Sequence, residues 1–199
     1  MFLAKQSTRQ IWQWLTVATL ALSAVVYVAL PIAAISWWQR PFPGFVLDPH
    51  LVVNDTSEPQ WAGSQASPPV AYPERVTAVD GQAVADNAEF WALLAARQVG
   101  DSIEVTFEQP TDALVAADAQ RPLMRTLTFP LTTFPNADKW NHFWLLYLTG
   151  LVTLAVGVWI FWLRPQAESA QIAAMLMAPG AVGIGGLFAY DFYIYADAL

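Results

Sequence analysis

Few side chains in this chain are of the kinds that perform chemistry. It has two histidines, His50 and His142, and no cysteine. A zinc site needs three or four converging ligands, and the sequence around neither histidine suggests such a set. Serines occur without a nearby histidine–carboxylate pattern, and the glycines of residues 183–186 lie inside an apolar run rather than between a strand and a helix. We therefore predict no catalytic residue, no metal site and no enzymatic activity.

His142 is the residue that could touch a cofactor. It lies about one turn inside the start of a long apolar segment, where an imidazole can ligate a haem or a chlorophyll-type pigment. A histidine that bonds water or lipid headgroups is the simpler interpretation, because polar side chains cost little near the end of a span. No cofactor is predicted, and a pigment or haem contacted through His142 or the Trp-rich spans stays open as an alternative.

Three uncharged runs dominate the sequence. The chain is 56% hydrophobic and only 13% charged, against about 25% charged residues in an average soluble domain. Each run is at least as long as the roughly 20 apolar residues that cross a bilayer. We predict an integral membrane, α-helical protein with three transmembrane helices over residues 11–39, 140–163 and 170–191. The length of the first run, about twice that of a signal-peptide core, favours an uncleaved anchor.

The charges that flank the runs predict the orientation. The N-terminal tail, residues 1–10, carries Lys5 and Arg9 and no acid, so the positive-inside rule places it in the cytoplasm. Residues 40–136 are then periplasmic or extracellular, and residues 164–169 form a short cytoplasmic loop. Residues 192–199 become an extracytoplasmic tail. This pattern predicts a multi-pass protein of the plasma (inner) membrane, embedded in the lipid bilayer.

The net charge of −7 lies mostly in the polar stretch between the first two spans. Proteins that bind nucleic acid present clustered lysines and arginines, so we predict no nucleic-acid partner.

Small and aromatic residues mark the spans. Tryptophans or tyrosines stand at the ends of each run, as in the aromatic belts of membrane proteins. In the third run Ala181, Gly185 and Ala189 recur every four residues, a spacing that lets helices approach closely. This stripe predicts helix packing, either on the protein's own second span or on another subunit.

The polar stretch carries the local signals of a small α+β domain. The strand "RVTAV" leads into the tight turn Asp80-Gly81. Asp86 and Glu89 form a capping box that begins a helix over residues 86–97, and Gly100 is typical of a helix end. "DSIEVTF" alternates as a strand, and "LMRTLTF" gives a last strand. Short strands are also expected at residues 45–47 and in "HLVVND".

This order of elements resembles a PDZ domain of the bacterial type. The match lies in "RVTAVDGQAVADNAEFWALLAARQVGDSIEVTF", about a third of the domain. The resemblance implies an inserted, extracytoplasmic PDZ-like domain over residues 40–136, with a peptide groove between residues 43–47 and the 86–97 helix. The departure is the segment "SPPVAYPE", which replaces the usual glycine-rich turn and could close the groove. The groove residues that the resemblance implies are Gly44, Phe45, Val46, Leu47, Phe90, Leu94 and Arg97.

Three functions fit the layout of a span, a polar domain and two more spans. The first is a non-enzymatic, membrane-anchored interaction subunit, an accessory or stabilising component that binds other membrane-protein subunits of a larger complex. The second is the sensory input module of a multi-pass signalling protein with a kinase or cyclase effector, since the layout resembles the N-terminal part of some such bacterial proteins. The third is a pigment- or cofactor-contacting subunit of an energy-transducing or photosynthetic membrane complex.

Overall fold

The computed structural model of the chain describes residues 2–109 and 123–187, which form two compact units. The helical unit contains residues 2–35 and 136–187. The sheet unit contains residues 36–109 and 123–135. The predicted outer tail, residues 192–199, and the end of the third predicted span lie outside the described residues. Each unit has a core of its own.

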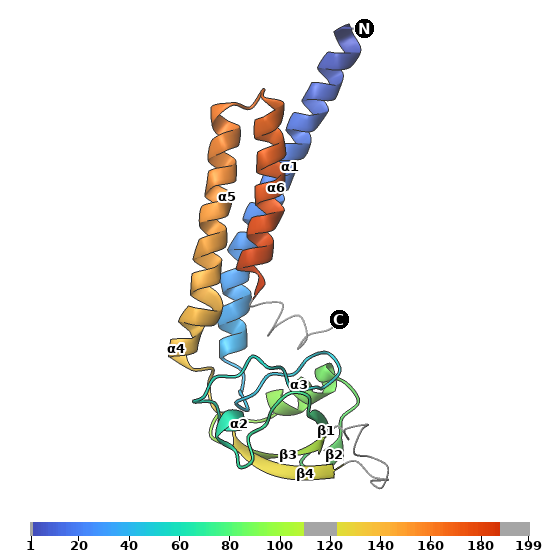
Figure 1. The fold of residues 1–199 in the computed structure, drawn as a ribbon, viewed down its shortest axis with the longest axis vertical. Coiled ribbons are helices and arrows are strands. Elements are labelled where there is room, and N and C mark those ends of the chain that lie inside the picture. The colour runs from blue at the N-terminus through green and yellow to red at the C-terminus, as the bar shows by residue number, and fades with distance from the viewer. Residues whose placement is uncertain (1, 110–122, 188–199) are drawn as a thin grey trace. The chain divides into compact units, whose positions relative to one another are not determined.

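The helical unit is built from three long helices and a short lead-in (Figure 1). Their bounds are α1 (Phe2–Trp38), α4 (Asn136–Lys139), the π-helical turn Trp140–Trp144, α5 (Leu145–Leu163) and α6 (Glu168–Gly185). Within the described residues, two helical segments are long and apolar enough to cross a membrane, Arg9–Trp38 and Asn136–Leu163. The third predicted span is represented by α6, which continues through Pro179 without ending there.

The outer face of α1 is strongly apolar. Leu22, Val25, Val28 and Ile32 are each between 66% and 69% exposed. An apolar surface of this extent is uncommon on a water-soluble monomer and is typical of a face that contacts lipid or another protein. The same face lacks charged side chains between residues 10 and 39.

The core of the helical unit is lined by small residues. α6 buries every third or fourth residue toward its neighbours, namely Ala170, Ala174, Ala178, Ala181 and Gly185. α5 faces this stripe with Gly150 and Gly157. A Cβ atom on Gly157 would lie 3.1 Å from Cβ of Met177. The helices therefore approach closely because glycine and alanine occupy the contact positions.

The sheet unit is a mixed α+β fold around one antiparallel sheet of four strands. Its strands, β1 (Arg75–Val79), β2 (Gln82–Ala83), β3 (Ser102–Gln109) and β4 (Leu123–Pro130), have the spatial order β2-β1-β3-β4. Its helices are α2 (Ala62–Gln65) and α3 (Asn87–Ala95). The strands expected around residues 45–47 and 51–54 are only isolated bridges, Leu47 with Val53 and Val52 with Arg75. Residues 45–47 are instead buried in the core of the sheet unit.

The capping box predicted for the helix of the sheet unit is confirmed. The backbone N–H of Glu89 donates to Oδ1 of Asp86 at 2.8 Å, and Oε2 of Glu89 accepts from the N–H of Ala85 at 2.8 Å. The predicted helix end is wrong, because α3 stops at Ala95. Gly100 serves the following turn, where its φ of +103° suits glycine and its N–H donates to the Leu131 carbonyl.

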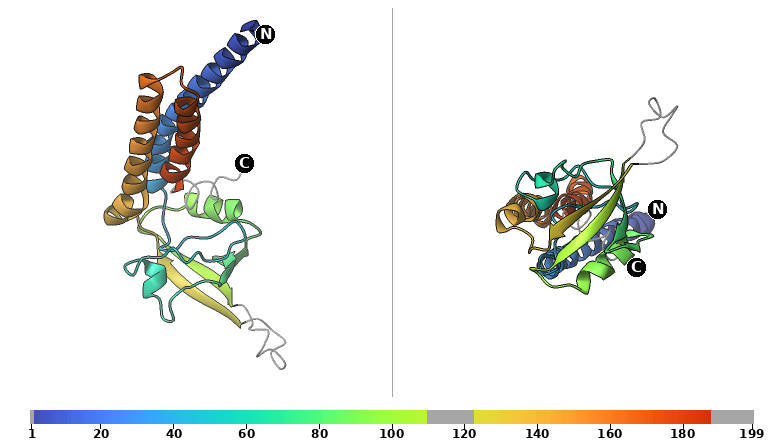
Figure 2. Two further views of the ribbon diagram at one scale, coloured as in Figure 1. Left: turned by 45° about the horizontal axis from the view of Figure 1, so that its top comes forward. Right: turned by 90° about the horizontal axis from the view of Figure 1, so that it is seen from below.

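One face of the sheet forms the core of this unit. Ile103, Val105 and Phe107 alternate along β3 and are at most 1% exposed, as the predicted alternation requires. α3 and the segment before β1 cover this face (Figure 2). Glu104 and Ser102, on the other face of β3, are exposed.

We expect a fragment of residues 36–135 to melt at a higher temperature than a fragment of residues 42–135. The shorter fragment lacks Trp37, which is 2% exposed and packs edge-on to Phe134 with ring centroids 5.3 Å apart. A loss of about 1 kcal/mol would lower the melting temperature by roughly 4–8 °C. Circular dichroism melts of the two purified fragments measure the difference. Equal melting temperatures would mean that Trp37 does not stabilise the unit.

Candidate functional site

The residues of the predicted groove lie together, but as part of the core. Phe45, Val46 and Leu47 are at most 2% exposed, and Phe90 and Leu94 of α3 at most 1%. The ring of Phe45 lies 6.2 Å from that of Phe90, centroid to centroid. A partner strand between residues 45–47 and α3 would therefore have to displace packed side chains.

Gly44 shows why the chain runs so close to its neighbours here. Its φ is +83°, and a Cβ atom at this position would lie 2.6 Å from the backbone nitrogen of Ala62. Gly63 approaches from α2, and its N–H donates to the Gly44 carbonyl at 3.0 Å. Gly44 thus positions residues 42–47 against α2.

The segment "SPPVAYPE" is held to the edge of the sheet. Arg125 of β4 donates to the carbonyls of Pro68 and Pro69 at 2.7 and 2.8 Å, and it forms an ion pair with Glu74 at 2.7 Å. The two charged side chains are only 15% and 11% exposed. A nearly buried pair of this kind fixes geometry, because removing one partner leaves the other charge desolvated.

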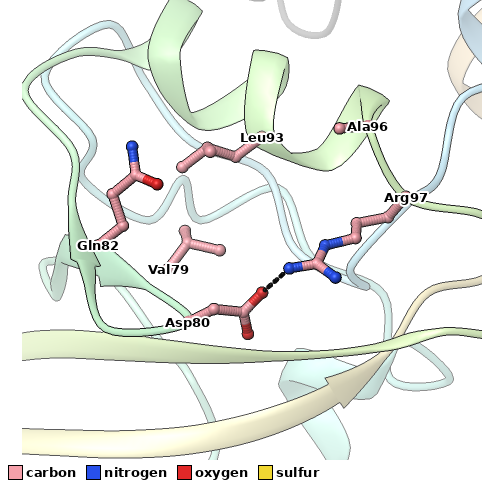
Figure 3. A pocket seen from close by; sticks show the side chains of 6 residues that line it. All are labelled: Val79, Asp80, Gln82, Leu93, Ala96 and Arg97. Atoms are coloured by element: carbon pink, nitrogen blue, oxygen red, sulfur yellow. Dashed lines mark hydrogen bonds and ion pairs between the residues drawn. The ribbon is translucent and has the colours of Figure 1, made fainter.

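An open pocket lies between the C-terminal end of α3 and the β1–β2 turn, with a volume of about 440 Å³. Its lining residues are Val79, Asp80, Gln82, Leu93, Ala96 and Arg97 (Figure 3). Arg97 is the only member of the predicted groove set that lines it. Leu93 of α3 and the two residues that follow its end, Ala96 and Arg97, meet the β1–β2 turn across this pocket. No helical period marks the set, because Arg97 shares the face of Phe90 and Leu94.

Asp80 lies at the edge of the pocket and connects three elements by hydrogen bonds. It adopts a φ of 49° in the Asp80-Gly81 turn, a conformation that aspartate tolerates better than most residues. Its Oδ1 accepts from the N–H of Glu104 at 2.8 Å, and its Oδ2 accepts from Nη2 of Arg97 at 2.7 Å. The carboxylate therefore ties the turn to both β3 and the end of α3.

The pocket is lined by both apolar and polar groups. Val79 and Leu93 supply apolar walls, while Gln82 and Arg97 offer polar groups at the rim (Figure 3). In the part of the chain whose side chains the structure describes, Asp80 Oδ2 is the only hydrogen-bond partner of the Arg97 side chain, which leaves further guanidinium donors for a ligand. Such a surface can hold a side chain or a short segment of a partner.

We expect Arg97→Glu to destabilise the sheet unit by about 1 kcal/mol or less. The two side chains are 48% and 33% exposed, so their attraction is screened by solvent. The substitution places a carboxylate next to Asp80, whereas the control Arg97→Gln only removes the cation. Urea unfolding at low and high salt measures the free energy of unfolding of both variants. High salt should reduce the difference between these two free energies, because it screens the repulsion between exposed carboxylates. A loss of several kcal/mol would indicate a structural role for Arg97 that its exposure does not suggest.

Five buried aromatic rings meet where the chain leads into and out of the sheet unit. They are Trp37, Phe42, Trp61, Trp91 and Phe134, and we call this set the aromatic junction. Its centroid distances include 5.3 Å for Trp37–Phe134, 5.2 Å for Phe42–Phe134 and 5.0 Å for Phe42–Trp61. Sequence reasoning missed this cluster, because its members are far apart in the chain.

The tryptophans that stand near the ends of the apolar runs differ in exposure, and Trp144 is half-buried. Trp37 and Trp38, expected in an aromatic belt, are only 2% and 8% exposed, so that expectation is wrong for them. The ring of Trp37 packs in the core of the sheet unit instead. Five others are about half exposed or more, as a belt requires, namely Trp12, Trp14, Trp140, Trp159 and Trp162.

His142 lies in the π-helical turn Trp140–Trp144 and is partly buried. Turns of this type interrupt the regular α-helical ladder and are frequent at functional sites. Within the described ranges no group of three or more His, Cys, Asp or Glu side chains could hold a metal ion.

The stripe on α6 contacts this chain's own helices. The hydroxyl of Tyr27 on α1 donates to the Ala181 carbonyl at 2.6 Å, and Gly185 lies against the same ring. Gly150 of α5 completes the contact, since a Cβ there would lie 2.6 Å from the Ala181 carbonyl oxygen. Ala189 lies outside the described residues. The stripe thus continues further toward the start of α6 than its predicted members, through the alanines at 170, 174 and 178.

Comparison of the chain with protein-family models and with curated protein sequences gives no match.

Proposed function

We propose that this chain is a non-enzymatic, membrane-anchored interaction subunit, an accessory or stabilising component of a larger membrane-protein complex. The observation that carries the proposal is the pocket between the end of α3 and the β1–β2 turn, in a mixed unit inserted between two long apolar helices. The helices hold the chain in the bilayer, and the inserted unit meets the partner. The unit fills its core with its own side chains, so the pocket is the surface that remains for binding a partner.

The sheet unit is best interpreted as PDZ-like. The order β1, Asp-Gly turn, β2, capped helix, β3 and β4 supports this interpretation, because the resemblance rests on the same order. The partner surface differs from the groove that the resemblance implies. Phe45 and Phe90 occupy that space with their rings, while Arg97, Leu93 and Gln82 are accessible from outside.

Three spans with a cytoplasmic N-terminus and an extracytoplasmic sheet unit are the proposed arrangement in the plasma membrane. Two contacts inside the helical unit support it. Arg9 donates to the carbonyl of Gln166, and Nε2 of Gln13 donates to the Pro165 carbonyl at 3.0 Å. The start of α1 and the α5–α6 loop therefore lie at one end of the helical unit, as the proposed arrangement requires.

Cysteine labelling in intact cells tests the arrangement, because the chain has no cysteine of its own. An impermeant maleimide should label Gln39→Cys from outside. Gln166→Cys should react only after the membrane is permeabilised. The reverse pattern would invert the proposed orientation, and labelling of both positions in intact cells would contradict a membrane-spanning chain.

Site-specific photo-crosslinking tests the partner surface. A photoreactive amino acid replaces Gln82 or Leu93 in the pocket, and Tyr72 serves as a control because it is 67% exposed on the same unit. In native membranes we expect protein adducts of one defined mass from positions 82 and 93 and none from position 72. Adducts with lipid alone, or equal adducts from all three positions, would contradict a partner at the pocket.

A sensory input module is the second candidate, and one observation favours it. α3 lines the pocket with Leu93 and contacts Trp37 of the aromatic junction through Trp91, so a ligand at the pocket would contact a helix that packs on the first chain connection. An open reading frame that continues past residue 199 into a kinase or cyclase domain would favour this candidate over the accessory subunit.

A further inference from the structure

We infer that α3 relays occupancy of the pocket at its C-terminal end to the two segments that connect the sheet unit to the rest of the chain, with the aromatic junction as the relay. This inference rests on the proposed function, because it concerns the regulation of the same pocket. It adds a physical route from the pocket to residues 37–42 and 132–134.

The two connecting segments are held together directly. The N–H of Phe42 donates to the Thr132 carbonyl at 2.7 Å, and the N–H of Thr132 donates to the Phe42 carbonyl at 2.9 Å. These reciprocal bonds form an antiparallel bridge between residues ninety positions apart. A displacement of one segment is therefore transmitted to the other.

The aromatic junction fixes both segments against the domain. Trp37 packs on Phe134 and Phe42 packs on Trp61, with interplanar angles of 72° and 83°. Edge-to-face pairs contribute about 0.5–1.5 kcal/mol each beyond the burial of their area. Close-packed interiors do not deform smoothly, so a ring that is pushed moves its neighbours.

α3 reaches this cluster through one residue. The ring of Trp91 lies 6.0 Å from that of Trp37 at 65°, and 5.4 Å from that of Phe90 at 84°. Trp91 is 6% exposed. Leu93 of the same helix lines the pocket, together with Ala96 at the helix C-cap and Arg97 directly after it. Because α3 is one short hydrogen-bonded helix, a ligand that shifts these residues also shifts Trp91 against Trp37.

A covalent probe tests the relay in the full chain, reconstituted in lipid nanodiscs. Since the chain has no cysteine, Ala96→Cys places a single thiol in the pocket, and N-benzylmaleimide then fills the pocket with an aromatic group. The ten tryptophans are replaced by 5-fluorotryptophan, and Trp37→Phe and Trp91→Phe assign the two ¹⁹F resonances. Alkylation is expected to shift both resonances by more than their line widths.

Matched controls separate a relay from a general effect. Tyr72→Cys, alkylated in the same way, should shift neither resonance, and Trp159 of α5 should keep its position throughout. Gln82→Cys fills the pocket from the opposite wall and should reproduce the response of Ala96→Cys. In a Trp91→Leu background the shift of Trp37 should be lost.

The outcomes are distinct. A shift of Trp91 without a shift of Trp37, or no shift of either from both pocket positions, overturns the relay. An equal response to Tyr72→Cys overturns it as well. The probe fills the pocket without any natural partner, so failure here leaves the crosslinking result untouched. Absence of a crosslinked partner would in turn leave the relay standing as a property of the fold.

Discussion

Gly185→Leu is expected to destabilise the helical unit by about 3 kcal/mol, at the upper end of the usual cost of overpacking. Gly183→Leu, two positions away on the same helix, is expected to cost little. A Cβ atom on Gly185 would lie 2.8 Å from Cζ and 3.2 Å from Cε1 of Tyr27, whereas a Cβ atom on Gly183 meets nothing within 4 Å. The larger leucine side chain would force α6 away from α1 and break the bond from the Tyr27 hydroxyl to the Ala181 carbonyl.

Thermal unfolding of the two variants in mild detergent measures the difference. Leucine is more apolar than glycine, so neither change should impair membrane insertion. The recovery of a larger complex after extraction gives a second readout. If Gly183→Leu abolished complex recovery while Gly185→Leu melted normally, the outer face of α6 would be the docking face and the inner face would be tolerant.

Phe45→Ala is expected to cost about 3–5 kcal/mol of the free energy of unfolding of the sheet unit, as for other fully buried phenylalanines. Phe45 is 1% exposed, and its ring centroid lies 5.5 Å from that of Phe107 and 5.2 Å from that of Phe129. Truncation would leave a cavity between the segment before β1 and two strands. A small domain can lose most of its stability from such a change.

Tyr72→Ala is the matched control, since this aromatic residue of the same unit is 67% exposed. Urea unfolding of the residue 36–135 fragment, followed by circular dichroism, gives both values. The control should change the stability by less than about 0.5 kcal/mol. A Phe45→Ala variant that folds as well as the parent and yet loses its partner would restore the predicted role of Phe45 in a peptide groove.

The elements that local sequence specifies could be predicted. The Asp80-Gly81 turn, the Asp86–Glu89 cap and the alternation in β3 each depend on residues a few positions apart, and all three are present. The two most apolar helical segments are equally local features, because length and composition alone identify them.

The candidate site was harder to predict because long-range packing decides it. Phenylalanines such as Phe45 and Phe90 are common both in binding grooves and in cores. Phe45 is identified as a core residue only by its packing on Phe107 and Phe129, which are distant in the sequence. Trp37 stands at the end of an apolar run, where a belt residue is expected, yet a phenylalanine almost a hundred positions later buries it. No short window of sequence contains such a pair.

The bridge between Phe42 and Thr132 has a consequence for how such a chain could have arisen. A domain whose first and last residues are hydrogen-bonded to each other can be inserted into a loop, or removed from it, with little change in the distance between the two ends of that loop. Replacement of residues 42–132 by a few glycines and serines should leave the two flanking helices at a similar separation. The sheet unit therefore has the closely spaced ends of an inserted domain, and a helical hairpin with a short loop could have acquired it in a single insertion.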